Sequence, residues 1–118
     1  HPRALIEPSA QLSAGVQVFP HAYVGSAAQI GYGVIVNTGA IVSHDCQVRD
    51  YANLSPGAIL AGEVTIGAAA LVGMGATVNL QVKIGEHARI GNGATVKRDV
   101  PENGIVHAGT VWPPDSSQ

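Results

Sequence analysis

Several residue types that usually stabilise a small domain are scarce in this chain. Its 118 residues include 1 cysteine and few aromatic side chains, namely 3 Tyr, 1 Trp and 1 Phe. A single cysteine excludes an internal disulfide, and with it the disulfide-stapled class of secreted scaffolds. Because large aromatic anchors are missing, the core must be built from Ala, Val, Ile and Leu. This composition favours a narrow, repetitive interior.

Positive charge and long apolar runs are scarce as well. The chain has 6 basic and 8 acidic residues, a net charge of −2, which argues against a dedicated nucleic-acid or anionic-membrane surface. No apolar run approaches the roughly 18 residues of a membrane helix, and no signal-peptide pattern is visible. We therefore expect no nucleic-acid partner, no membrane partner and a cytoplasmic location.

What the chain does contain is glycine, 15 residues in all, and a strict repeat of six. Every sixth residue from Ile6 onward is aliphatic, and the residue two positions earlier is always Ala, Val or Cys. The aliphatic series is Ile6, Leu12, Val18, Val24, Ile30, Val36, Val42, Val48, Leu54, Leu60, Ile66, Val72, Val78, Ile84, Ile90 and Val96. Repeats of this kind indicate a solenoid.

The hexad predicts a strand and a corner. Two inward residues flanking one outward residue match the period-2 alternation of a short strand. The next three residues form the corner, and glycines at its first position, such as Gly67 and Gly73, are expected to relieve backbone strain. Three hexads make one triangular coil, so residues 1–98 predict an all-β domain of about five parallel coils. Because Glu102 interrupts the aliphatic series, residues 99–118 are expected to form a tail or cap.

The outward residues define three faces of the prism. One face begins with four large apolar side chains in a row, Leu5, Tyr23, Ile41 and Ile59. Such a stripe normally marks an interface, so we infer a homo-oligomer packed through it; a covering N-terminal segment or further domain is the alternative. A second face is polar and predicted to be solvated, with Gln11, Gln29, Gln47, Thr65 and Lys83.

One corner carries residues suited to catalysis. His44 lies two residues after the inward Val42 and therefore points outward, beside Asp45. A carboxylate next to an imidazole holds one tautomer and stabilises the imidazolium, as a general base requires. Cys46 falls on a small inward position, so we interpret it as core filler.

The segment Asn37-Thr38-Gly39-Ala40-Ile41-Val42-Ser43-His44-Asp45-Cys46 resembles a known family, together with Leu54-Ser55-Pro56-Gly57-Ala58, Ala61-Gly62 and Val72-Gly73-Met74-Gly75-Ala76. The family is that of hexapeptide-repeat sugar acyltransferases related to sialic acid O-acetyltransferases and bacillosamine-pathway N-acetyltransferases. The resemblance implies a left-handed β-helix, a homotrimer with its site between subunits, acetyl-CoA as co-substrate, and a sugar-like acceptor acetylated on an amine or hydroxyl. It implies His44 as the base, Asp45 as its tuning acid and the Gly62 N–H as the oxyanion donor.

The resemblance also implies binding roles for further residues. Asn37 and Thr38 would line the acceptor site, while Asn53, Gly73, Met74 and Asn92 match acetyl-CoA contacts. Basic residues near the end of the repeat would suit the phosphates of CoA; these include Lys97 and Arg98.

The sequence departs from the family in three places. Asn53 stands where some relatives have a second His, and Gly109-Thr110-Val111-Trp112 replaces the usual Asn-Pro-Ala-Lys. The nucleotide-sugar-binding domain with which relatives commonly begin has no counterpart in this sequence.

Two other functions are known alternatives for a chain with this repeat. A zinc γ-class carbonic anhydrase needs three convergent His, but the positions predicted to stack with His44 hold Ser26, Gly62 and Leu80, so we predict no metal site. A non-catalytic β-helix assembly module is the other alternative, since the His–Asp corner could be present without being used.

Overall fold

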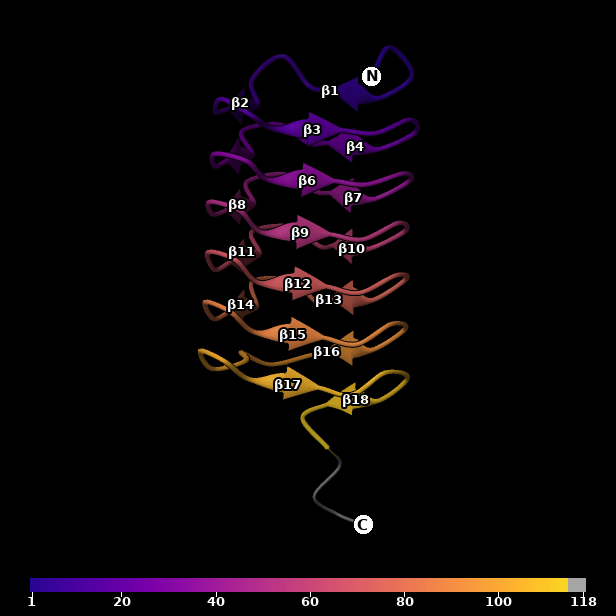
Figure 1. Ribbon diagram of the computed structural model, residues 1–118, viewed down its shortest axis with the longest axis vertical. Coiled ribbons are helices and arrows are strands. Elements are labelled where there is room, and N and C mark those ends of the chain that lie inside the picture. The colour runs from indigo at the N-terminus through magenta and orange to yellow at the C-terminus, as the bar shows by residue number, and fades with distance from the viewer. Residues whose placement is uncertain (115–118) are drawn as a thin grey trace.

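The computed structural model describes residues 1–114, which coil around one long axis (Figure 1). Within these residues the chain forms 18 strands of two residues and no helix. From β1 (Leu5–Ile6) to β16 (Thr95–Val96), successive strands fall in turn on three parallel sheets, so each full coil in this part adds one strand to each sheet. The described part contains no helix long and apolar enough to cross a membrane.

We name the sheets A, B and C in chain order. Sheet A contains β1 (Leu5–Ile6), β4 (Tyr23–Val24), β7 (Ile41–Val42), β10 (Ile59–Leu60), β13 (Thr77–Val78), β16 (Thr95–Val96) and β18 (Val111–Trp112). Sheet B contains β2 (Gln11–Leu12), β5 (Gln29–Ile30), β8 (Gln47–Val48), β11 (Thr65–Ile66) and β14 (Lys83–Ile84). Sheet C contains β3 (Gln17–Val18), β6 (Ile35–Val36), β9 (Asn53–Leu54), β12 (Leu71–Val72), β15 (Arg89–Ile90) and β17 (Ile105–Val106).

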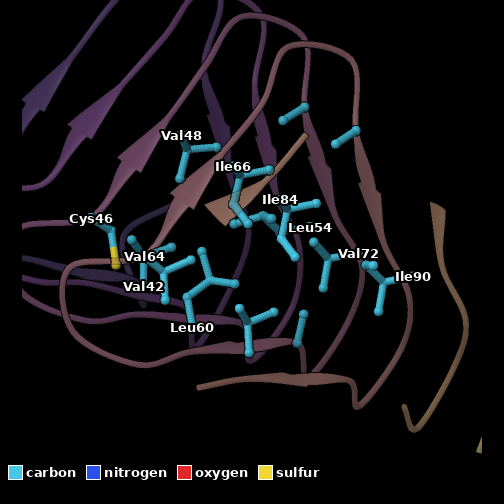
Figure 2. Close-up of a cluster of buried hydrophobic side chains, with 14 of the residues drawn as sticks. Val42, Cys46, Val48, Leu54, Leu60, Val64, Ile66, Val72, Ile84 and Ile90 are labelled. Atoms are coloured by element: carbon cyan, nitrogen blue, oxygen red, sulfur yellow. The ribbon is translucent and has the colours of Figure 1, made fainter. Parts of the chain in front are cut away.

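The register follows the hexad. Ile41 pairs with Tyr23 in the preceding coil and with Ile59 in the next coil, each 18 residues away. The second residue of each of these strands points inward, and Val42 and Leu60 are 0% exposed. Figure 2 shows aliphatic side chains from the three sheets, among them Ile66, gathered in one cluster. The predicted parallel β-helix is confirmed, and hexapeptide repeats of this type imply its left-handed form.

Cys46 belongs to this core, as predicted. Its side chain is 0% exposed, and its thiol donates a hydrogen bond to the Ala61 carbonyl oxygen at 3.1 Å. Burial raises the pKa of the Cys46 thiol above its ordinary value. A buried neutral thiol of this kind fills space and is a poor nucleophile.

The solenoid continues beyond the expected end of the repeat. Val100 bridges to Ile84, and β17 and β18 pair with β15 and β16. These partners are 16 residues apart (84 to 100, and 95 to 111), because the corner after β16 is two residues shorter than the others. The inward series therefore resumes in a shifted frame as Val100, Val106 and Trp112. As far as residue 114, the expected tail is a further coil; residues 115–118 lie outside the described part.

Glycines at the first position of a corner have a different role from the one expected. A Cβ on Gly67 would lie 2.5 Å from the Glu86 backbone nitrogen of the next coil, so glycine there permits close stacking. The left-handed backbone falls two residues later in the corner, and non-glycine residues such as Asp45 (φ 58°) and Ala69 (φ 57°) adopt it. Strain at the corner is thus not what selects glycine at its first position.

Candidate active site

His44 and Asp45 lie together at the corner between β7 and β8, where the chain passes from sheet A to sheet B. The preceding coil positions this corner, because the Asp45 N–H donates to the Ser26 carbonyl oxygen at 2.9 Å. His44 Nδ1 lies 3.0 Å from Asp45 Oδ2, and both side chains are 57% exposed. The predicted pair is therefore formed and open to solvent.

This contact determines what the imidazole can do. A carboxylate only accepts hydrogen bonds, so the Nδ1 that faces Asp45 carries the proton. In the neutral ring Nε2 then has a free lone pair, as a general base needs. When Nε2 takes up a proton, the adjacent carboxylate stabilises the resulting imidazolium.

Gly62 lies beneath the His44 ring in the next coil. The Glu63 N–H donates to the His44 carbonyl oxygen at 3.0 Å, which confirms that residue 62 stacks on residue 44. A Cβ on Gly62 would be 2.5 Å from His44 Nε2, so any side chain there would displace the imidazole. Among the described residues no protein acceptor pairs with the Gly62 N–H. The Gly62 N–H is thus unpaired within the described chain, although Gly62 itself is buried against His44.

A second group of predicted residues lies at the opposite edge of sheet A, where the chain enters it from sheet C. The Met74 N–H donates to Asn92 Oδ1 at 2.9 Å, and the Thr38 N–H donates to Asn37 Oδ1 at 2.8 Å. Gly73 is pressed against this contact, since a Cβ there would lie 2.7 Å from Asn92 Oδ1. We call this edge the C–A corner.

The remaining predicted residues are dispersed. Asn53 lies on the outer face of sheet C between Ile35 and Leu71. Lys97 and Arg98 are exposed at the shortened corner after β16, where the Lys97 N–H donates to the Trp112 carbonyl oxygen at 2.7 Å. One chain therefore brings His44, Asp45 and Gly62 together and holds the C–A corner and Asn53 apart from them.

A pocket that the sequence pattern does not reveal lies next to Asp45. It has a volume of about 370 Å³ and is lined by Ala27, Gln29, Asp45, Gln47, Glu63 and Thr65. The stacking rule that relates His44 to Gly62 would also have paired Asp45 with Glu63, 18 residues on. A polar outward series predicts a solvated face and does not reveal a hollow in it.

No metal cluster accompanies the site. Within residues 1–114, no group of three or more His, Cys, Asp or Glu side chains is placed to hold a metal ion.

Comparison with known families agrees with the repeat. Residues 63–98 match the family described as bacterial transferase hexapeptide (six repeats). Over these residues the match agrees with the period of six in the sequence. No curated protein matches it in a sequence search.

Solved structures give a closer likeness. The acetyltransferase domain of PglB from Neisseria gonorrhoeae, in complex with acetyl coenzyme A, is 36% identical, with a TM-score of 0.91 over 93% of this chain and 54% of that one. PerB from Caulobacter crescentus, in complex with CoA and GDP-perosamine, is 38% identical, with a TM-score of 0.89 over 91% of this chain and 52% of that one. The chain spans about half the length of these relatives.

A more distant structure shares the fold alone. The UDP-N-acetylglucosamine acyltransferase of Francisella novicida is 19% identical, with a TM-score of 0.66 over 92% of this chain and 66% of that one.

Proposed function

We propose that the protein transfers an acetyl group from acetyl-CoA to an amine or hydroxyl group of a sugar-like acceptor. The observation that carries this proposal is the His44–Asp45 pair, 3.0 Å apart, with the His44 ring lying over Gly62. The likeness to a structure with acetyl coenzyme A and to another with CoA and GDP-perosamine supports the choice of donor and of a sugar acceptor.

The chemistry follows from the geometry. The acceptor attacks the thioester carbonyl carbon while His44 Nε2 takes its proton, and the Gly62 N–H donates to the oxyanion that develops. The intermediate then expels the CoA sulfur, which receives the proton from His44. The products are the acetylated acceptor and free CoA, and Asp45 holds the imidazole in the productive orientation throughout.

We also propose that three copies pack as a trimer through the outer face of sheet A. Leu5 is 60%, Ile41 37% and Ile59 38% exposed on this face, and the Tyr23 hydroxyl donates to Glu7 Oε1 at 3.1 Å. That hydrogen bond raises the pKa of Tyr23 above its ordinary value. Packing copies through this face would carry the C–A corner of one copy toward His44 of the next.

Acetyl-CoA would then lie between copies. Gly73, Met74 and Asn92 would contact it at the C–A corner, with Asn53 close by on sheet C and Asn37 and Thr38 on the acceptor side. The phosphates of CoA would face Lys97 and Arg98, whose side chains are exposed.

Replacing His44 tests the function directly. His44→Ala removes the base, so CoA release with an amino-sugar acceptor should fall by a factor of about 10² or more. Binding should survive, because the imidazole is not a predicted CoA contact; acetyl-CoA should still raise the melting temperature of the variant. The matched control is His87→Ala, at an exposed corner between sheets B and C.

Wild-type rates in His44→Ala would contradict the mechanism. No thermal protection of the wild-type chain by millimolar acetyl-CoA would instead favour a non-catalytic assembly module.

A further inference from the structure

The shortened corner formed by residues 97–99 is held differently from the regular corners. In the regular ladder of sheet B, the Thr65 N–H donates to the Val82 carbonyl oxygen of the next coil at 3.1 Å. One coil later the Lys83 N–H donates instead to Asp99 Oδ1 at 2.8 Å, so a side chain replaces the carbonyl oxygen. This corner therefore depends on side chains where the regular corners depend on the backbone ladder.

Trp112 ties both ends of the 97–99 corner. The Lys97 N–H donates to the Trp112 carbonyl oxygen at 2.7 Å, and Trp112 Nε1 donates to the Asp99 carbonyl oxygen at 3.1 Å. The Trp112 backbone pairs with Val96 in the preceding coil, and its ring packs against the buried cluster. The first and last residues of the corner are thus fastened to one anchored residue, an arrangement that we call the Trp112 clamp.

This corner is the one place where two Lys or Arg residues are adjacent in the sequence. Lys97 and Arg98 are both exposed, and no ion pair joins either of them to Asp99 within residues 1–114. The corner follows β16 as the His44 corner follows β7, so both lie on the edge of sheet A toward sheet B. They are three coils apart, which is about 14 Å at the usual strand spacing.

That separation matches the length of the arm of CoA. About 13 bonds join the thioester sulfur to the first phosphorus atom, and an extended chain of that length spans about 15 Å. With the thioester at His44, the phosphates of acetyl-CoA reach the 97–99 corner. The two cationic side chains there can form charge-assisted hydrogen bonds to phosphate oxygens.

We propose that Trp112 is a positioning residue that holds the 97–99 corner in place for the phosphates of acetyl-CoA. This role rests on the function proposed above and adds a reason why the donor is recognised through its phosphates. A corner that is fixed before binding loses less conformational freedom on binding, so the clamp raises the affinity for CoA without touching it. Trp112 ends the segment that stands in place of the usual Asn-Pro-Ala-Lys, so the family pattern does not supply this clamp.

Trp112→Phe tests the clamp, because it removes the Nε1 donor and keeps an aromatic ring against the core. The Kd for CoA in calorimetry and the KM for acetyl-CoA should each rise about tenfold, with kcat for an amino-sugar acceptor nearly unchanged. S-acetylpantetheine lacks the phosphates, so its kcat/KM should be the same in the variant and the wild type. An equal fall of kcat/KM for both donors would overturn the role of Trp112.

The control for stability is Val106→Ala, because Val106 is 3% exposed in β17 of the same final coil and makes no bond to the corner. This variant should lower the melting temperature and leave the KM for acetyl-CoA nearly unchanged. An equal rise of that KM in Val106→Ala would show that Trp112 acts through stability alone, which would reject the proposal.

A combined variant shows through which residues the clamp acts. Lys97→Ala with Arg98→Ala removes the side chains that meet the phosphates, so adding Trp112→Phe should raise the Kd for CoA little further. Fully additive effects would place the action of Trp112 elsewhere and contradict the clamp.

Failure of the clamp and failure of the proposed function are separable. If the wild-type chain binds CoA without transferring acetyl groups, and Trp112→Phe weakens that binding, the clamp stands and the function is rejected. If the wild-type chain transfers acetyl groups and Trp112→Phe leaves the Kd for CoA unchanged, the function stands and the clamp is rejected.

Discussion

At the scale of single residues, the site depends on contacts between coils. Ser26 holds the Asp45 backbone from the preceding coil, and Gly62 leaves room for the His44 ring in the following coil. Asp45 itself has a φ of 58°, a conformation that Asp and Asn tolerate better than most residues. Its identity therefore serves the corner and the imidazole together.

Asp45→Asn separates these two roles. Asn keeps the shape and tolerates the same backbone conformation, so the melting temperature should hardly change. Its amide can donate to Nδ1, which moves the ring proton to Nε2 and removes the base. Steady-state kinetics should show kcat lowered about 10²-fold or more, without loss of acetyl-CoA binding.

The control is Asp50→Asn, because the Asp50 carboxylate only accepts a hydrogen bond from the Tyr32 N–H and an amide oxygen can do the same. If Asp45→Asn retained full turnover, the carboxylate would have no part in orienting His44.

At the scale of elements, each strand divides its two residues between core and surface. In β10, Leu60 is 0% exposed and Ile59 is 38% exposed on the proposed interface. Truncating the first should affect folding, and truncating the second should affect assembly.

Truncating Leu60 and Ile59 separately tests this division between core and surface within one strand. Leu60→Ala leaves a cavity in the core and should lower the free energy of unfolding by about 2–5 kcal/mol in chemical denaturation. Ile59→Ala should change the free energy of unfolding of the single chain much less, yet shift sedimentation toward smaller species. A monomeric wild type at micromolar concentration would remove the interface from the proposal.

The repeat of six residues explains which features of the fold and of the candidate site could be predicted from the sequence. It correctly assigned the inward columns, the stacking of Gly62 on His44 and the apolar face of sheet A. It failed at Glu102, since a shorter corner shifts the frame by two residues and the series continues from Val100. It also gave the wrong reason for glycine at positions such as Gly67, because a repeat does not record how closely successive coils approach.

At the scale of the whole molecule, sheet A separates the two groups of predicted site residues. His44 lies at its edge toward sheet B, and Asn92 lies at the C–A corner. A complete site as proposed therefore requires residues from two copies.

Mixing inactive variants tests this arrangement. His44→Ala and Asn92→Ala should each be inactive, but refolding them together in equal amounts should restore about a quarter of the wild-type sites by random pairing. CoA release is the readout, and each variant refolded alone is the control. No recovery in confirmed mixed oligomers would place the whole site within one chain.

The first coil has a neighbour on one side only, and its strands are more exposed than those that follow, as Leu5 and Ile6 show. Because each coil contacts only adjacent coils, opening spreads inward from the ends one coil at a time, as in other solenoids. The corner of His44 is bonded to coils on both sides, through Ser26 and Glu63. End fraying therefore leaves this corner intact, and the geometry of the His44–Asp45 pair should outlast the loss of the outermost turn.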